Sequence, residues 1–113
     1  MKQDTKKYPL TINLDENCSL VPLITIYVSN GRLAILIYDE DGEFFCDMTV
    51  NLPRCQLSKK ANNLAFIDTN NCPWLPDFID KHQLGAPTGH IGFSGFCEYP
   101  EYEFDLSKLN TDI

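Results

Sequence analysis

Apolar and polar residues alternate along the first half of the chain, a pattern typical of β-strands. Between Tyr8 and Leu14 every second residue is apolar, which predicts a strand that begins at Pro9 or just before it. Pro22–Ser29 is rich in β-branched and aromatic residues, and Arg32–Tyr38 is equally apolar. Asp15–Leu20, which lies between the Tyr8–Leu14 strand and the Pro22–Ser29 run, is predicted as a loop.

Two turn signals join these strands to a third. Asn30-Gly31 separates the two central runs, and Asp41-Gly42 follows the second. Such pairs favour tight hairpin turns because they tolerate positive φ angles. The next run, Glu43–Leu52, is predicted as one strand with a more apolar face made of Phe44, Cys46, Met48, Val50 and Leu52. The pattern from Pro22 to Leu52 therefore predicts a three-stranded antiparallel meander.

The second half contains the one clear helix candidate. A polar, basic loop over Pro53–Asn63 and a short strand over Leu64–Asp68 precede it. The helix is predicted over Asn71–Gly85, with Asn71 or Cys72 as its cap, Pro73 in its first turn and Gly85 at its left-handed end. One face of this helix would carry Trp74, Phe78, Ile79 and His82.

After the helix, Gly85–Phe96 is predicted as a glycine-punctuated loop and Cys97–Leu106 as a strand. The chain from Ser107 is predicted as a short helix or a flexible tail, and residues 1–7 as flexible. The fold class is therefore α+β: an antiparallel sheet, a meander of about five strands, with one short helix packed on it. We expect one domain over residues 1–113.

The charge balance limits the partners that this chain can have. Sixteen acidic residues against nine basic ones give a net charge of −7. Direct nucleic-acid binding needs a basic surface, so it is not expected, and binding to a membrane surface is disfavoured for the same reason. An acidic protein can attract a basic protein surface. Charged Met1–Tyr8 is not followed by an apolar segment, which predicts no secretory signal and a cytoplasmic location.

The five cysteines do not form a metal-binding or disulfide pattern. None has C-x-x-C spacing, and we expect reduced, mostly buried thiols. Cys72, Cys97, His82 and His90 fit no zinc-binding spacing, so we expect no metal and no cofactor. The predicted helix N-terminus would lower the pKa of Cys72. No catalytic signature surrounds that thiol, however, and the prediction is a protein that is not an enzyme.

Two segments are candidates for a binding site. Asp68, Asn70 and Asn71 lie between a strand and the predicted helix. The glycine-rich segment carries His90, and Phe93 with Phe96 could serve there as aromatic anchors. A small-ligand pocket between Asp68–Cys72 and His90–Cys97 would bring the two segments together. The alternative is turn chemistry in the first segment and a compact loop with core aromatics in the second.

Acidic residues on the last strand form a second candidate surface. Glu101, Glu103 and Asp105 share one face at a period of two, and Asp39–Glu43 adds further acids at a hairpin tip. Such a stripe could imitate a row of phosphates and bind a nucleic-acid-handling protein. The alternative is a solvated strand face that protects a sheet edge.

Several short runs resemble a small bacterial family of unknown function, DUF4313. They are Phe66–Asn71, Pro87–Gly89, Ser94–Cys97 and Tyr99–Pro100 with Tyr102–Phe104, within a resemblance that spans about residues 30–106. The resemblance implies an association with conjugative and other mobile elements and no catalytic residue. The function that follows is a non-enzymatic interaction or accessory factor of a mobile element, with an anti-defence role among the expectations. The alternative function is small-ligand binding or a minor enzyme activity at the two-segment pocket.

Overall fold

The computed structural model describes residues 5–13 and 16–111. In these residues eight strands form two four-stranded antiparallel sheets. Sheet A has the order β1-β2-β3-β4, and sheet B the order β5-β6-β8-β7. The elements are β1 Tyr8–Asn13, β2 Glu16–Ile26, β3 Leu33–Asp39, β4 Phe44–Asp47, β5 Thr49–Val50, β6 Leu64–Ile67, α1 Leu75–Lys81, β7 Gly85–Ser94, β8 Cys97–Phe104 and the 3-10 helix η1 Leu106–Lys108.

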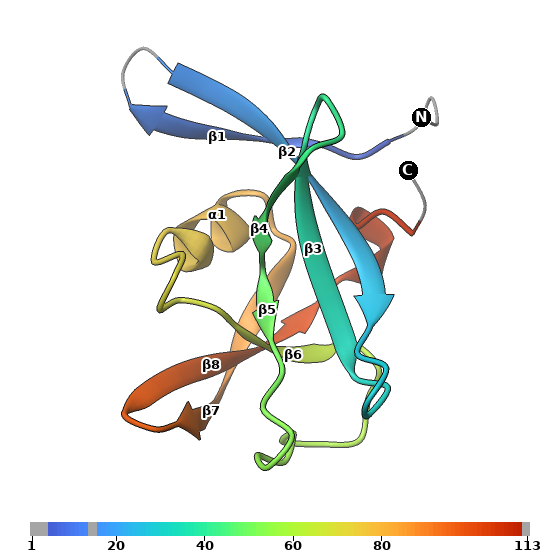
Figure 1. The fold of residues 1–113 in the computed structure, drawn as a ribbon, viewed down its shortest axis with the longest axis vertical. Helices are drawn as coiled ribbons and strands as arrows, with labels where there is room; N and C mark the ends of the chain where they lie inside the picture. The colour runs from blue at the N-terminus through green and yellow to red at the C-terminus, as the bar shows by residue number, and fades with distance from the viewer. Residues whose placement is uncertain (1–4, 14–15, 112–113) are drawn as a thin grey trace.

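The chain passes from sheet A to sheet B at Met48, between β4 and β5 (Figure 1). Met48 donates its N–H to the Ile35 carbonyl of sheet A, and its own carbonyl accepts from Asp68, which follows β6. Its side chain is fully buried. This residue therefore joins the two sheets through the backbone and fills the space between them.

The main core lies where sheet A, α1 and one face of sheet B meet. It contains Leu20, Ile35, Ile37, Met48, Ala65, Ile67, Leu75, Phe78, Ile79, Leu84, Tyr102, Phe104 and Leu109, among other buried residues. Because α1 is only seven residues long, its stability comes from burying Leu75, Phe78 and Ile79 in this core.

A second, smaller core covers the opposite face of sheet B. Leu52, Phe66 and Tyr99 are buried there, with Leu57 packed against them. The segment 53–63 that leads into β6 supplies this cover. Sheet B is therefore enclosed on both faces over part of its area.

The predicted α+β fold class is confirmed, but the strands are eight in two sheets rather than about five in one. The predicted strand over Glu43–Leu52 is divided at Met48 into β4 and β5, which belong to different sheets. The predicted loop over Asp15–Leu20 is wrong from Glu16 onward, because β2 begins there and pairs with β1. Leu14 and Asp15 lie outside the described residues.

The helix is shorter than predicted at both ends. Its N-cap is Trp74, whose side chain makes no capping hydrogen bond, so neither Asn71 nor Cys72 caps it. The left-handed residue after the helix is Gln83, with φ of 54°, rather than Gly85. Gly85 instead begins β7, where an added Cβ would lie 2.6 Å from the Glu103 carbonyl oxygen.

The largest difference between the prediction and the structure lies in the glycine-rich stretch. Gly85–Ser94 is not a loop but the strand β7, which pairs with β8. Its register shifts between Pro87 and Ile91, where Gly89 has a φ of +91°. The glycines here permit a bulge and close packing, whereas the local sequence suggested turns.

The chain from Ser107 was predicted as a short helix or a flexible tail, and the structure has a short 3-10 helix there, η1. Beyond it, Asn110 is buried and exchanges backbone hydrogen bonds with β2: its N–H donates to Pro22, and its carbonyl accepts from Ile24. Its side chain also accepts a hydrogen bond from the Lys6 N–H. The two ends of the described chain are therefore tied together at sheet A.

Candidate functional site

The β7–β8 hairpin carries the most exposed aromatic side chain of the described residues. Phe96, in the turn, is fully exposed, and Phe93 and Ile91 are 58% and 42% exposed. Ile91 and Phe93 are two residues apart on β7 and so lie on the same face of the sheet. In Figure 1 the hairpin extends away from sheet A. Three apolar side chains are thus presented to solvent on one projecting element.

The hairpin is shaped by its turn and by one close contact. Ser94 pairs with Cys97, which leaves a two-residue turn in which Gly95 has a φ of +61°. Gly92 packs tightly on the small core, because a Cβ there would lie 2.7 Å from Leu52 Cδ1. The hairpin therefore packs on the small core at Gly92, while Phe96 in its turn stays exposed.

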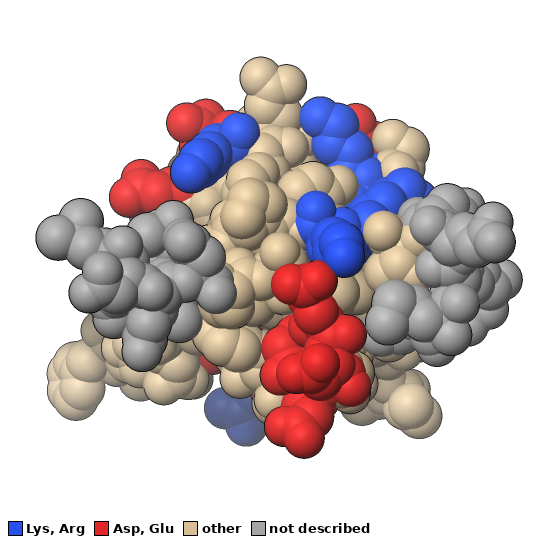
Figure 2. Space-filling view, turned by 90° about the horizontal axis from the view of Figure 1, so that it is seen from above, with Lys and Arg blue, Asp and Glu red and all other residues tan. Residues whose placement is uncertain are grey.

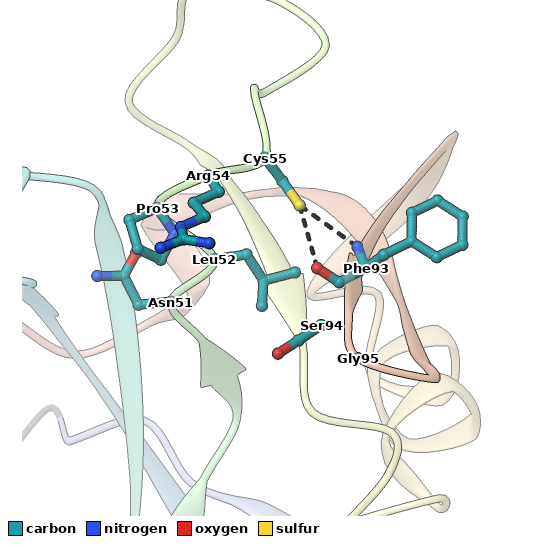
Figure 3. Close-up of a pocket in the computed structure, with 8 residues that line it drawn as sticks. All are labelled: Asn51, Leu52, Pro53, Arg54, Cys55, Phe93, Ser94 and Gly95. Atoms are coloured by element: carbon teal, nitrogen blue, oxygen red, sulfur yellow. Dashed lines mark hydrogen bonds between the residues drawn. The ribbon is translucent and has the colours of Figure 1, made fainter.

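A thiol occupies the outer edge of β7 at Phe93. The Cys55 thiol donates to the Phe93 carbonyl at 3.3 Å and accepts from the Phe93 N–H at 3.4 Å (Figure 3). The Phe93 ring itself points away from Cys55 in this view. Cys55 was not among the predicted site residues, and no pattern in the sequence relates it to a strand 38 residues away.

An open hollow of about 370 Å³ lies beside this contact. Asn51–Cys55 form one wall and Phe93–Gly95 the other, with Ser94 directed towards Leu52 (Figure 3). The predicted pocket paired His90–Cys97 with Asp68–Cys72. The hollow beside the hairpin is lined by Asn51–Cys55, rather than by Asp68–Cys72, on the side opposite Phe93–Gly95.

Asp68, Asn70 and Asn71 form a turn. The Asp68 carboxylate accepts from the N–H of Asn71 at 3.3 Å and from its side-chain amide at 2.9 Å, and the Asp68 carbonyl accepts from Cys72. Asn70 and Asn71 are exposed, whereas Asp68 is buried. The hydrogen-bonding capacity of Asp68 is therefore used within the turn, as the structural alternative predicted.

Glu101 is fully buried, which contradicts its predicted place on an exposed acidic face. Its carboxylate accepts from the Ser58 N–H at 2.8 Å, the Ser58 hydroxyl at 2.5 Å and the Thr88 hydroxyl at 2.7 Å. Burial alone would raise the pKa of Glu101, but these hydrogen bonds outweigh it and hold the pKa below the ordinary value of 4.5. The group anchors segment 53–63 to sheet B.

His90 belongs to the same anchor. Its Nε2–H donates to the Gln56 carbonyl at 2.8 Å, and its backbone N–H donates to the Thr88 hydroxyl at 3.2 Å. Its ring lies 6.0 Å, centroid to centroid, from that of Phe66. The structure therefore brings His90 together with Glu101, two predicted site residues that the sequence analysis had assigned to different surfaces.

The other two acids of the predicted stripe are also engaged. Glu103 pairs with Lys59 at 2.7 Å. Asp105 accepts from both the hydroxyl and the N–H of Ser107, and these hydrogen bonds lower its pKa. An exposed stripe of Glu101, Glu103 and Asp105 is therefore not present, because the first is covered, the second is neutralised and the third caps η1.

Charges of both signs also occur at the other predicted acidic cluster. Lys7 Nζ lies 3.0 Å from the Glu40 carboxylate, and its hydrogen bond lowers the pKa of that carboxyl group. Figure 2, which views the molecule from above, shows lysine and arginine groups beside the acidic ones. On the face seen in Figure 2, acidic groups thus lie beside basic ones rather than as a uniform acidic surface.

The Cys46 and Cys72 thiols have raised pKa values, which disfavours the nucleophilic thiolate form. Burial raises the pKa of Cys72, and the Asp68 and Asp47 charges raise it further, despite the hydrogen bond with Cys46 that lowers it. The helix N-terminus was predicted to have the opposite effect. Burial and the neighbouring Cys72 thiol likewise raise the pKa of Cys46. All five cysteines lie in the described ranges, and none forms a disulfide. Cys72 is buried and the other four are half-buried, so the prediction of mostly buried thiols is wrong for those four.

Over the described ranges, 5–13 and 16–111, no three histidine, cysteine or acidic side chains are placed to share a metal ion. No helix in this part of the chain is both long and apolar enough to cross a bilayer.

Comparison with known proteins identifies the family and no more. No curated protein and no solved structure matches the chain. The model of the domain of unknown function DUF4313 matches residues 23–112, and the chain therefore belongs to this family.

Proposed function

We propose that this protein is a non-enzymatic interaction protein that binds another protein through the tip of its β7–β8 hairpin. The observation that carries the proposal is the exposure of Ile91, Phe93 and Phe96 on one projecting element. Single exposed apolar residues are common on protein surfaces, but grouped aromatic side chains mark binding sites more often. Aromatic residues also contribute a large share of binding energy in protein interfaces.

The charge of the protein favours a partner with a basic surface. The net charge is −7, and exposed Glu98 lies opposite Phe93 in the hairpin. A basic protein surface would be attracted over a distance of about 10 Å at ordinary ionic strength. Proteins that handle nucleic acid have such surfaces, and they remain the partner class that we propose.

The cellular setting rests on family resemblance. We place the protein in the bacterial cytoplasm as an accessory factor of a mobile element, with anti-defence activity as one form of that role. The acidic stripe no longer supports this idea, because Glu101 is buried. The hairpin tip replaces it as the binding surface.

A second candidate function is small-ligand binding in the hollow between Asn51–Cys55 and Phe93–Gly95. Its volume of about 370 Å³ is at the lower end of the range for ligand pockets. Arg54 and Ser94 could bind a polar group there. A set of nucleotides and metabolites should then raise the melting temperature of the wild type and fail to do so for Arg54→Ala.

The proposed function is tested by affinity capture from a bacterial lysate, followed by binding of the identified partner in purified form. Phe93→Ser with Phe96→Ser should abolish capture. Phe44→Ser is the matched control, because Phe44 is 55% exposed but lies on sheet A. Capture of the same partner by the double variant at wild-type affinity would exclude the hairpin tip as the binding surface.

A further inference from the structure

β7 is an edge strand of sheet B, and its half next to the turn lacks the usual protection of such strands. It spans ten residues, Gly85–Ser94, and none of them is an acid, a lysine or an arginine. Edge strands are commonly protected by charged side chains, proline or bulges. Here Pro87 and the register shift before Ile91 protect the first half of the strand only. The half next to the turn, Ile91–Ser94, keeps regular pairing with β8.

The register shows which backbone groups face outward from this half. Ser94 and Cys97 close a two-residue turn, so they form a hydrogen-bonded pair, and the pairs alternate from there. Phe93 opposite Glu98 and Ile91 opposite Pro100 are therefore non-hydrogen-bonded pairs. The N–H and carbonyl groups of Ile91 and Phe93 point away from β8, towards the open side of the sheet.

The Cys55 thiol confirms this orientation, since it bonds both backbone groups of Phe93 from the outer side. It stands where the backbone of a neighbouring strand would lie. A thiol is a weak donor and a weak acceptor, whereas a peptide group is strong in both roles. Replacing the thiol by a peptide backbone would therefore strengthen both hydrogen bonds at Phe93.

We propose, building on the proposed function, that the partner adds an extended strand to the β7 edge at Ile91–Phe93 and displaces the Cys55 thiol. The new strand pairs with the outward backbone groups of Ile91 and Phe93. Its alternate side chains contact Ile91 and Phe93 on one face, and exposed Phe96 lies beyond them in the turn. Side chains on the other face enter the hollow that Ser94 lines.

Charge decides between a foreign strand and a second copy of this chain. A second copy would bring a further charge of −7 to a molecule that already carries −7. β7 itself is uncharged, and Glu98 lies opposite Phe93 on the neighbouring strand. The occupant that fits is an extended segment of another protein, apolar at alternate positions, with lysine or arginine beside the apolar part.

The test uses short random peptides displayed on phage and selected on the immobilised wild-type protein. Ile91→Pro removes an outward N–H that the β7–β8 pairing does not use, and proline is tolerated at such edge positions. Ile91→Ala is the matched control, because it shortens the side chain and keeps the N–H. Strand addition predicts binding to Ile91→Pro at least about tenfold weaker than to Ile91→Ala, as expected for one lost hydrogen bond together with the strand geometry.

A second measurement needs no protein variant, so it holds even if Ile91→Pro folds poorly. A selected peptide is synthesised in two forms, with N-methyl groups on its odd or on its even backbone nitrogens. Strand addition predicts that only one form loses binding, since alternate amides face β7. It also predicts slower hydrogen exchange at the Ile91 and Phe93 amides in the complex.

The proposal is overturned if both methylated forms bind alike, if Ile91→Pro binds as well as Ile91→Ala, or if selection yields no peptide that depends on Ile91. The proposed function fails by a different result, namely partner binding that survives loss of Phe93 and Phe96 side chains. If binding requires the Phe93 and Phe96 side chains but is the same for both methylated peptides, the proposed function stands and strand addition is excluded.

Discussion

The carboxylate of Glu101 holds Ser58 by two hydrogen bonds, one from the backbone N–H at 2.8 Å and one from the hydroxyl at 2.5 Å. This contact fixes segment 53–63 against sheet B. The same segment carries Cys55, which bonds the edge of β7 at Phe93. A buried carboxylate therefore positions one wall of the hollow beside the hairpin without facing solvent itself.

Glu101→Gln should destabilise the protein by about 1–3 kcal/mol at pH 7, because the amide cannot accept all the hydrogen bonds that the carboxylate receives. The measurement is urea unfolding. Glu103→Gln is the matched control on the same strand: its ion pair with Lys59 is partly exposed, so the loss should stay below about 1 kcal/mol. Equal losses for the two variants would show that Glu101 is no anchor.

The pKa of Glu101 gives this contribution a pH dependence. Its folded pKa lies below the ordinary value of 4.5, so the unfolded chain binds the proton more tightly. The stabilisation is therefore complete above pH 4.5 and is lost as the pH falls through the folded pKa. We expect the gap in unfolding free energy between wild type and Glu101→Gln to stay constant from pH 7 to about pH 4.5 and to narrow below it. A gap that is constant down to pH 3 would contradict the assignment.

The strands built on local alternation were predictable from the sequence, and those that depend on distant contacts were not. β1 and β3 follow the apolar pattern closely. β7 was missed because its glycines are typical of loops, and only the neighbours explain them: Gly85 lies against the Glu103 backbone, and Gly92 against Leu52 and Phe66. The division of Glu43–Leu52 at Met48 likewise depends on two sheets meeting.

The candidate site was predicted in part. Phe93 and Phe96 were expected as anchors and are exposed. Ile91 was missed, although its spacing of two from Phe93 is a strand signal that the intervening glycine obscured. Glu101 was misplaced because a period of two assigns a residue to a face but does not say what covers that face. Segment 53–63 covers it, and its polar composition indicated only a loop.

Gly92 offers a test of how closely the hairpin is seated. A Cβ at this position would lie 2.7 Å from Leu52 Cδ1 and 2.8 Å from Phe66 Cε1. Gly92→Ala should therefore cost about 1–3 kcal/mol of unfolding free energy, as overpacked cores do. Gly85→Ala should cost more, since its Cβ meets the Glu103 backbone, which moves less easily than a side chain. Thermal unfolding of both variants shows which of them loses more stability. If Gly92→Ala is as stable as the wild type, the Leu52 and Phe66 side chains of the small core move to make room for the added Cβ.

Alkylation tests whether the Cys46 and Cys72 thiols are as unreactive as their raised pKa values indicate. Because burial raises the pKa of Cys72 and of Cys46, little thiolate is present at pH 7. Iodoacetamide should label both far more slowly than free cysteine, and concentrated urea should remove the difference. Mass spectrometry of digested samples gives the rate for each residue. Labelling of native Cys72 as fast as free cysteine would revive a nucleophilic role.

Alanine substitutions at Phe96 and Phe66 should separate an effect on partner binding from an effect on folding stability. Phe66 is 2% exposed in the small core, so Phe66→Ala should cost about 3–5 kcal/mol of unfolding free energy. Phe96 is fully exposed, and Phe96→Ala should change that free energy by less than about 0.5 kcal/mol. A residue that leaves stability unchanged but is required for partner capture acts in recognition. A large loss of stability in Phe96→Ala, measured by urea unfolding, would instead mean that its ring packs within the protein in solution, and the hairpin tip would no longer be free to bind.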